Sequence, residues 1–378
     1  MNLPNLKLRC LLVAAGLGAL ACNEPRMPAE PGEPEPQTRT YTLGFTDFPH
    51  AFSSAAVAAA YDVIARDGDL AVMHFDGGVP WQQALDGTPY PPNVQGELTS
   101  KARSIPAGHE VYLAVTPIGF TRDGLAPKWE TTTDEPLDPP WDRRTFDHPE
   151  VITAFGNHCE RMIQNFAPDY FALAIEANML AYFVPSQWPA FVTLADSVYR
   201  RLKRAHPDLP VFITLQANAF HLSPSAQRAA IADILPFSDL IAVSAYPFTD
   251  QPDPDLLPAD YFAQLANLAP DKPFAIAETA WPAEDVTAPY PTFIPASDST
   301  QLAYMQRLLA DCDKLSARFV TWFFTRDYDD LWETHLKSSP IAAIARVWKD
   351  TGLYDGAGNP RPALQPWREK LALRRVTP

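Results

Sequence analysis

Two glutamates stand out because each of them ends an otherwise apolar stretch of sequence. Residues 169–176 read Asp-Tyr-Phe-Ala-Leu-Ala-Ile-Glu, and residues 272–278 read Lys-Pro-Phe-Ala-Ile-Ala-Glu. Burying a carboxylate there costs free energy unless the charge is paired or has a function. If Glu176 and Glu278 face one cleft, one can act as a general acid and the other as a nucleophile. The alternative is a structural role for both, as partners of nearby arginines or as helix caps.

Other polar and aromatic residues follow apolar segments elsewhere and are candidates for binding a substrate. Hydrogen-bonding side chains suit sugar hydroxyls, and an exposed tryptophan ring suits the apolar face of a pyranose. A lone histidine at such a position is as often structural, and tryptophans in proline-rich loops often only pack those loops. The candidates that this pattern gives are Asp47, His74, Asp76, Asn178, Gln216, Asn218 and Trp281.

Charge and missing motifs exclude several classes of function. The formal net charge of −15 argues against a nucleic-acid partner, which needs clustered Lys and Arg. Beyond the first 21 residues we find no P-loop, no Rossmann glycine pattern, no Gly-x-Ser-x-Gly and no His-Glu-x-x-His. We therefore expect no cofactor and no metal. Asp329, Asp330 and Glu333 could contribute to a calcium site, but a solvated acidic loop explains them better.

The candidate residues are spread over a chain that alternates short apolar segments with longer segments of helical periodicity. Nearly continuous apolar runs are typical of parallel strands covered on both faces, and the alternation implies right-handed crossovers. Eight such units predict an α/β fold, a single-domain (β/α)8 TIM barrel. An open doubly wound sheet is the alternative, but it would usually begin with a Gly-rich turn. The expected strands are 42–45, 70–75, 110–116, 170–176, 211–216, 240–246, 273–278 and 318–323, and the expected helices are 51–66, 93–103, 149–166, 186–205, 224–235, 258–269, 299–313 and 338–350.

Loop lengths place the candidate site. The long connections, 76–92, 117–148, 281–298 and 324–337, follow strands, whereas the connections before strands are mostly short. Long loops after strands lie at the C-terminal face of a barrel, where barrel active sites are built.

These motifs resemble glycoside hydrolase clan A, whose members are retaining (β/α)8 enzymes with glutamates ending strands four and seven. The chain looks most similar to the family 53 endo-β-1,4-galactanases and their relatives, over residues 41–350. The resemblance implies that Glu176 is the acid/base and Glu278 the nucleophile. It also implies that Tyr246, in Ala-Val-Ser-Ala-Tyr-Pro, holds the nucleophile, and that Trp322, in Thr-Trp-Phe, forms part of the floor of the sugar site.

The same resemblance implies a function and shows one departure. A retaining glycoside hydrolase of this kind would cleave a neutral β-linked polysaccharide or oligosaccharide by double displacement, with the two carboxyl groups roughly 5–5.5 Å apart. The clan usually has Asn directly before the acid/base, whereas this chain has Ile175, and Asn178 follows two residues after the glutamate. The departure motivates a second hypothesis of another class, a non-catalytic glycan-binding or sensing lipoprotein on a degenerate glycosidase barrel.

The N-terminal segment resembles the signal of a bacterial lipoprotein. Residues 1–9 carry Lys7 and Arg9, and residues 10–21 form an apolar run too short to span a bilayer comfortably. Small residues precede Cys22 in Ala-Leu-Ala-Cys, so we expect a signal peptide over 1–21 and a lipid on Cys22. The alternative is ordinary signal cleavage with an incidental cysteine.

The segment after the signal predicts a tether. Residues 22–40 are rich in Pro and Glu and favour an extended chain, and residues 41–378 form the expected catalytic barrel. By the sorting pattern of enterobacterial lipoproteins, Asn23 after the cysteine indicates the outer membrane. We expect a monomer in the cell envelope, at the outer membrane or cell surface, that touches the membrane through its lipid only. Cys159 and Cys312 are expected to be two buried free thiols.

Overall fold

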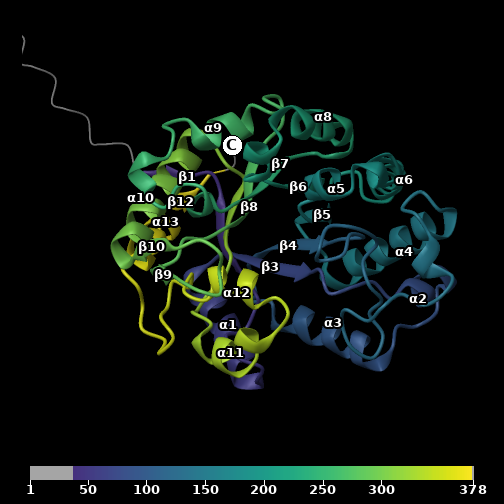
Figure 1. Ribbon diagram of the computed structural model, residues 1–378, viewed down its shortest axis with the longest axis horizontal. Coiled ribbons are helices and arrows are strands. Elements are labelled where there is room, and N and C mark those ends of the chain that lie inside the picture. Colours follow the sequence, from purple (N-terminus) through teal and green to yellow (C-terminus); the bar gives the residue numbers. More distant parts are fainter. Residues whose placement is uncertain (1–36, 377–378) are drawn as a thin grey trace, which may run out of the picture. The chain divides into compact units, whose positions relative to one another are not determined.

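Eight parallel strands close into a barrel, as the sequence predicts (Figure 1). The computed structural model describes residues 37–376, so the predicted signal peptide, Cys22 and almost all of the tether lie outside the described residues. Barrel neighbours follow the order β11-β2-β3-β4-β5-β6-β7-β8, with β11 closing onto β2. The barrel strands are β2 (Thr42–Thr46), β3 (Leu70–Phe75), β4 (Glu110–Val115), β5 (Tyr170–Ala174), β6 (Val211–Gln216), β7 (Ile241–Ala245), β8 (Phe274–Thr279) and β11 (Phe319–Trp322).

Helices surround the barrel, and each predicted helical segment contains one, although α9 and α12 are shorter than predicted. They are α1 (Ser54–Asp67), α3 (Pro92–Ser104), α4 (Pro149–Phe166), α6 (Trp188–Ala205), α8 (Pro224–Ile234), α9 (Tyr261–Ala266), α10 (Asp298–Lys314) and α12 (Ala342–Trp348). The sequence analysis did not predict the short elements in the loops and at the ends of the chain. These are α2 (Trp81–Asp86), α5 (Asn178–Phe183), α7 (Ala219–Leu222), α11 (Asp329–Thr334), α13 (Leu364–Leu371), the hairpin β9 (Glu284–Val286) with β10 (Ile294–Ser297), the pair β1 (Thr38–Arg39) with β12 (Arg374–Arg375), and the 3₁₀ helices η1 (Trp141–Arg143), η2 (Pro185–Gln187), η3 (Leu235–Phe237), η4 (Pro247–Thr249), η5 (Pro254–Leu256) and η6 (Leu336–Ser338).

Local sequence explains why these helices form where they do. In α6, Leu194, Val198 and Leu202 recur at a spacing of four and are all buried, which gives the helix one apolar face against the barrel. In α10, the side chain of Ser297 accepts a hydrogen bond from the backbone N–H of Thr300, and the Thr300 side chain accepts one from the backbone N–H of Ser297. This capping box satisfies N–H groups that the first helical turn leaves without partners.

Two apolar layers hold the barrel together. The interior is filled by alternate residues of the strands, among them Leu70 and Val72 of β3 and Ala275 and Ala277 of β8. The strand residues between them point to the outer face of the barrel and pack against the helices. Cys159 on α4 and Cys312 on α10 are buried there as free thiols, as predicted.

The base of the barrel ties the two ends of the described chain together. Strand β1 pairs in parallel with β12, and Arg39 binds Asp69, which directly precedes β3. Thr38 and Arg39, expected to belong to the tether, therefore form part of the barrel unit, which begins at Thr38. This junction lies at the N-terminal ends of the strands.

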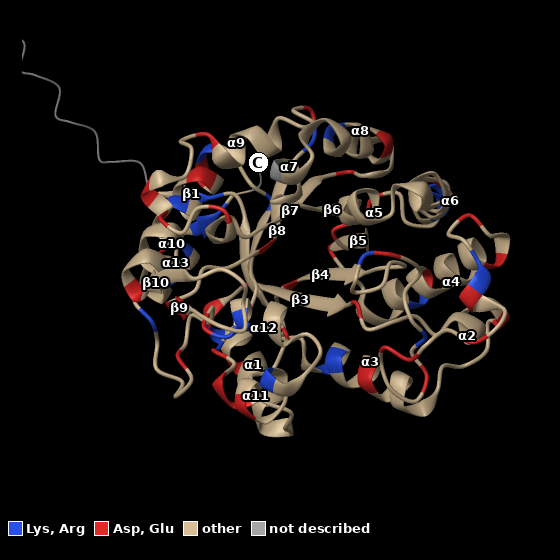
Figure 2. Cartoon of the chain, viewed as in Figure 1, with Lys and Arg blue, Asp and Glu red and all other residues tan. Residues whose placement is uncertain are grey.

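The surface carries charges of both signs, interspersed over the outer helices (Figure 2). Between residues 37 and 376, no helix combines the length and the apolar character that crossing a membrane requires.

A buried ion-pair network fixes the long connection after β11. Arg361 binds Asp327, and it also binds Asp298 at 2.7 Å and Glu284 at 3.0 Å. Asp327 is almost fully buried; burial raises the pKa of its carboxyl to about 7, although the charge of Arg361 opposes this. Arg361 is therefore the cation on which this part of the chain depends.

We expect Arg361→Ala to lower the free energy of unfolding by about 3–5 kcal/mol, because it leaves the buried carboxylate of Asp327 without its partner. The control is Lys337→Ala, which removes the exposed pair of Lys337 with Glu333 and should cost about 0–1 kcal/mol. Urea denaturation of both variants measures the difference. Equal losses would contradict the assigned role.

Candidate active site

Glu278 lies inside β8 and is buried at the C-terminal end of the barrel. Its side chain is 6% exposed, and its Oε2 accepts a hydrogen bond from the hydroxyl of Tyr246 at 2.7 Å. Strict alternation would point residue 278 toward the helices, since Ala275 and Ala277 face the interior. The pairing of β7 with β8 shifts register between Ile276 and Glu278, and this irregularity turns the glutamate inward. Tyr246 therefore has the contact to Glu278 that the resemblance implies.

Glu176 follows β5 by two residues and is held in an unusual backbone conformation. Its φ of 48° lies in the left-handed region, which costs a non-glycine residue of order 1–3 kcal/mol. The hydroxyl of Thr214 accepts a hydrogen bond from the Glu176 N–H at 2.8 Å, and the pairing of β5 with β6 is irregular just before it. Ile175, where the resemblance expects Asn, points into the apolar barrel interior. Strained backbone of this kind clusters at functional sites.

An arginine that the sequence analysis did not identify binds Glu176. Arg122 lies in the loop after β4 and donates to Glu176 Oε2 at 3.2 Å and to the carbonyl of Gly119 at 3.2 Å. Its side chain is almost fully buried, and its Nε lies buried without a hydrogen-bond partner. The long loop after β4 was the available signal, but nothing in the sequence indicates which of its residues reaches the barrel mouth.

The two carboxylates share one electrostatic environment. The pKa of Glu278 is raised to about 7, mainly by burial; the charge of Glu176 contributes to the rise, while His74, Tyr246 and Arg122 act against it. Burial and the charges of both glutamates also hold the pKa of Tyr246 well above its ordinary value, so Tyr246 acts as a hydrogen-bond donor. The ends of β5 and β8 thus bring both predicted carboxylates to the same mouth of the barrel.

His74 and Asp76 form a second pair beside Glu278. The Nδ1 of His74 lies 3.4 Å from Glu278 Oε1, and its Nε2 lies 3.5 Å from Asp76 Oδ2. Burial alone would lower the pKa of His74, but the charges of Asp76 and Glu278 raise it. Burial alone would raise the pKa of Asp76, but the charge of and hydrogen bond to His74 lower it to about 2. His74 thus lies between two carboxylates, and in its protonated form it offsets part of the negative charge at the site.

Two tryptophans predicted to face the sugar are buried elsewhere. Trp281 stacks on Tyr304 with ring centroids 4.7 Å apart, and Trp322 donates its indole N–H to the carbonyl of Thr351. Both have an exposed fraction of 0%, so neither can stack on a substrate. The physical reason for Trp322 is strand alternation: residue 322 of β11 belongs to the layer that faces the helices.

Phe323 and Trp348 take the place of those tryptophans at the site. The ring of Trp348 lies 4.4 Å from that of Tyr246, and the ring of Phe323 lies 5.9 Å from it. Phe323 directly follows Trp322, so strand alternation turns its side chain to the opposite face of the barrel wall. Both rings line a cavity of about 500 Å³ that also touches Asp76.

Four further predicted binding residues have structural partners instead. Asn178 is fully buried, and its amide bridges the backbone of Gln216 and the side chain of Gln227. Gln216 caps the turn that follows β6 by accepting hydrogen bonds from the N–H groups of Asn218 and Ala219.

The side chains of Asn218 and Asp47 likewise bind other groups of the protein. Asn218 donates to the carbonyl of Tyr246 at 3.2 Å and accepts from its N–H at 3.4 Å, which holds the backbone of the tyrosine that binds Glu278. Asp47 is buried against Lys101 and Tyr61, at 2.6 and 2.9 Å. Most polar atoms of these four residues serve turns and ion pairs of the protein, which does not support a role in sugar binding; Oδ1 of Asp47 lies buried without a hydrogen-bond partner.

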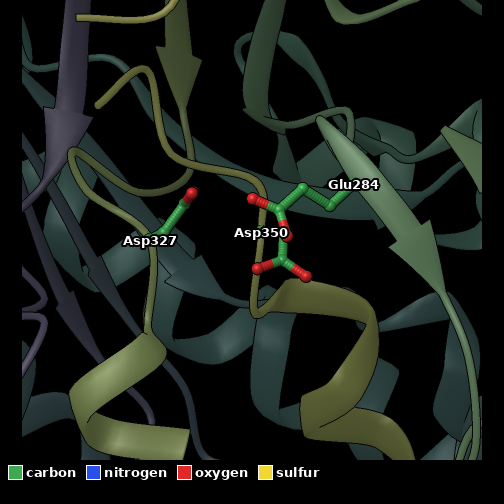
Figure 3. Close-up of side chains that lie close together, drawn as sticks. All are labelled: Glu284, Asp327 and Asp350. Atoms are coloured by element: carbon green, nitrogen blue, oxygen red, sulfur yellow. The ribbon is translucent and has the colours of Figure 1, made fainter. Parts of the chain in front are cut away.

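A separate acidic cluster needs no metal to explain it. Its members, whose oxygens approach within 4.8 Å, are Glu284, Asp327 and Asp350 (Figure 3). Arg361 binds the first two, and Arg346 and Lys349 bind the third at 2.8 and 2.6 Å. Because each carboxylate has a cationic partner, we assign the cluster to the ion-pair network of the fold.

Solved structures that resemble this chain are glycoside hydrolases. GH5_18 from Streptomyces cattleya, in complex with GlcNAc, matches with a TM-score of 0.63 and 17% identity over 89% of this chain and 80% of that one. The exo-β-1,4-mannosidase Op5Man5 from Opitutaceae bacterium strain TAV5 matches with a TM-score of 0.62 and 14% identity over 88% of this chain and 59% of that one. The GH53 catalytic domain of Ignisphaera aggregans matches with a TM-score of 0.50 and 16% identity over 90% of this chain and 98% of that one.

The likeness lies in the fold. No protein-family model matches the sequence, and no curated protein does. The structural neighbours are clan A glycosidases, and the family 53 fold implied by the sequence resemblance is among them.

The contacts of Glu278 predict how its pKa responds to substitution. Tyr246→Phe should raise the pKa of Glu278, because it removes a hydrogen bond that stabilises the carboxylate. Glu176→Gln should lower it, because it removes a repelling charge. Carbon-13 NMR titration of the glutamate carboxyl carbons measures both shifts, with Lys337→Ala as a control. Shifts in the same direction would contradict this geometry.

Proposed function

We propose that this protein is a retaining glycoside hydrolase that acts on a neutral β-linked oligosaccharide or polysaccharide. One observation carries the proposal: carboxylates from the fourth and seventh barrel strands meet at the C-terminal mouth, with Glu278 buried and hydrogen-bonded by Tyr246. The fold shared with glycosidases supports it, as does the GlcNAc complex of the Streptomyces cattleya neighbour.

In the proposed mechanism one carboxyl group is the nucleophile and the other is the acid/base. Glu278 attacks the anomeric carbon, forming a carbon–oxygen bond to the enzyme while the bond to the leaving oxygen breaks. Glu176, in its protonated form, gives its proton to that oxygen. In the second step Glu176 takes a proton from water, the water oxygen attacks the same carbon, and Glu278 leaves as a carboxylate. Tyr246 holds one oxygen of Glu278 throughout.

Two observations support the alternative, a non-catalytic glycan-binding protein on the same barrel. Ile175 replaces the polar residue expected before the acid/base with a buried apolar one. Arg122 binds Oε2 of Glu176, so the carboxyl group that would have to reach the leaving oxygen already has a partner within the protein. A hydrolase must therefore loosen the contact between Arg122 and Glu176 when substrate binds, whereas a binding protein need not.

Substitution of the two glutamates separates these functions. Glu278→Ala should abolish turnover on every substrate, since no glycosyl-enzyme can form. Glu176→Ala should slow cleavage of natural glycans by about 10²–10⁴-fold but spare the first step on an aryl glycoside with an acidic phenol. Glycosyl-enzyme should then accumulate, and azide should restore turnover and yield a glycosyl azide of retained configuration.

The substrates are found by screening purified protein against polysaccharides for reducing ends and against aryl glycosides for released phenol. Glu333→Gln, an exposed carboxylate on α11, is the matched control and should keep wild-type rates. Unchanged activity in both Glu176→Ala and Glu278→Ala would refute the catalytic roles. Glycan binding without any turnover in the wild type would favour the alternative.

We further propose that Cys22 carries a lipid and that the protein lies in the cell envelope, at the outer membrane or cell surface. The described chain joins the barrel at Thr38, at the end of the barrel opposite Glu176 and Glu278. The Pro- and Glu-rich composition of residues 22–40 favours an extended tether.

Cys22→Ser should release the protein from the membrane fraction into the soluble fraction, because the only expected membrane contact is lost. Cell fractionation and mass spectrometry of the mature N-terminus measure this, with Cys159→Ser, a buried thiol in α4, as the cysteine control. A wild-type protein that is soluble with an unmodified N-terminus would disprove the anchor.

A further inference from the structure

The two glutamates at the barrel mouth are held in different ways. The carboxyl of Glu278 has Tyr246 at one oxygen and His74 at the other. Among the side chains that the structure describes, the carboxyl of Glu176 has one hydrogen-bond partner, Arg122. The side chain of Glu176 is 17% exposed, against 6% for Glu278, so packing restrains it less. The position of the Glu176 carboxyl therefore depends on Arg122.

The backbone of Glu176 is fixed by other contacts, which leaves the side chain as its movable part. Its N–H donates to the hydroxyl of Thr214 at 2.8 Å, and its carbonyl accepts from the N–H of Met179 at 3.0 Å. A general acid must lie within hydrogen-bond reach of the oxygen that it protonates, and a misplacement of about 1 Å can cost about 10²-fold in rate. The carboxyl therefore needs a holder in addition to those of the backbone.

Arg122 is itself fixed by the turn that carries it. The carbonyl of Gly119 accepts from the backbone N–H of Arg122 at 2.8 Å and from its guanidinium at 3.2 Å. The side-chain amide of Gln187 donates to the carbonyl of Asp123 at 3.0 Å. Gln187 ends η2, which follows α5, so the turn is tied to the segment that continues from Glu176. The guanidinium is therefore a rigid point of attachment for the Glu176 carboxyl.

The contact between Arg122 and Glu176 carries unfavourable features in both residues. Both have a positive φ, 58° at Arg122 and 48° at Glu176, and the Nε of Arg122 is buried without a hydrogen-bond partner. Such features persist only where the surrounding structure imposes them, and they cluster at functional sites. Holding the carboxyl that would protonate the leaving oxygen gives them a reason.

We propose that Arg122 is a positioning residue of the reaction, whose guanidinium presents the carboxyl of Glu176 to the leaving oxygen at the barrel mouth. This inference rests on the proposed glycosidase function and adds a residue to it. The hydrogen bond between the two side chains, at 3.2 Å, lies at the long end of the usual range, so substrate can loosen it without displacing the arginine. Arg122 acts through Glu176 and not on the reacting atoms.

The test uses the dependence of rate on the leaving group. For aryl glycosides of the sugar that the screen identifies, kcat/KM reports the first step, which needs the acid more as the phenol becomes more basic. Arg122→Met should keep kcat/KM for the most acidic phenol within about twofold of wild type and lower it about 10–10²-fold for the most basic phenol. A purely structural loss would lower kcat/KM by the same factor for every phenol.

Three further variants isolate the effect. Arg122→Lys should restore part of the loss, because it keeps the charge but not the planar fork that binds Glu176 and Gly119 together. Adding Arg122→Met to Glu176→Ala should cost less than about twofold more, because the group that Arg122 positions is already gone. Arg200→Met, which removes an exposed arginine of α6, is the matched control and should keep the wild-type dependence.

The outcomes separate this proposal from the function on which it rests. An equal loss for every phenol, or a full further loss in the Glu176→Ala background, overturns the role of Arg122 even though glycosides are cleaved. A wild type that cleaves no glycoside refutes the glycosidase, and crystal structures of wild type and Arg122→Met then decide the positioning. A Glu176 carboxyl that moves or loses order in the variant supports it, and an unchanged carboxyl overturns it.

Discussion

The buried carboxylate of Glu278 is the constraint around which the rest of the site is arranged. A charge at the end of an apolar strand needs partners, and here Tyr246 donates a hydrogen bond to it and His74 lies against its other oxygen. Each partner has a support of its own, because Asn218 holds the backbone of Tyr246 and Asp76 holds His74. Asn218 and Asp76 therefore help to hold Glu278 in place although they do not contact it directly.

The same constraint decides where a proton can reside. Burial, together with the charge of Glu176, raises the pKa of Glu278 in the ligand-free protein, and Arg122 binds Glu176. A retaining mechanism needs Glu278 charged and Glu176 protonated. A substrate must also reach the Glu176 carboxyl group that Arg122 binds in this structure.

Strand pattern sufficed to predict the barrel and to place Glu176 and Glu278 at the same end of it, because apolar runs and their ends depend on local sequence. The contact of Tyr246 with Glu278 was implied only by the family resemblance. The aromatic floor was missed by one residue: alternation along β11 from the inward-facing Phe319 would have selected Phe323 rather than Trp322. Alternation alone would have failed for Glu278, which a register irregularity turns inward. Such irregularities, like the loop that carries Arg122 to the barrel mouth, depend on tertiary pairing and leave no local signal.

The apolar cavity depends on interactions well away from the carboxylates. Helix α12 supplies Ile344 and Trp348 to the cavity, and the same helix carries Arg346, which binds the buried Asp350 at 2.8 Å and the carbonyl of Asp285 at 2.7 Å. Because Trp348 packs on Tyr246, the position of this helix is transmitted to the hydroxyl that holds Glu278. Buried ion pairs are weak evidence of stability gained over apolar packing, but they fix one geometry, since removing a partner leaves a charge unpaired. The acidic cluster of Glu284, Asp327 and Asp350 thus has a physical reason to be ionic: its ion pairs hold α12, which shapes the cavity and supports Tyr246.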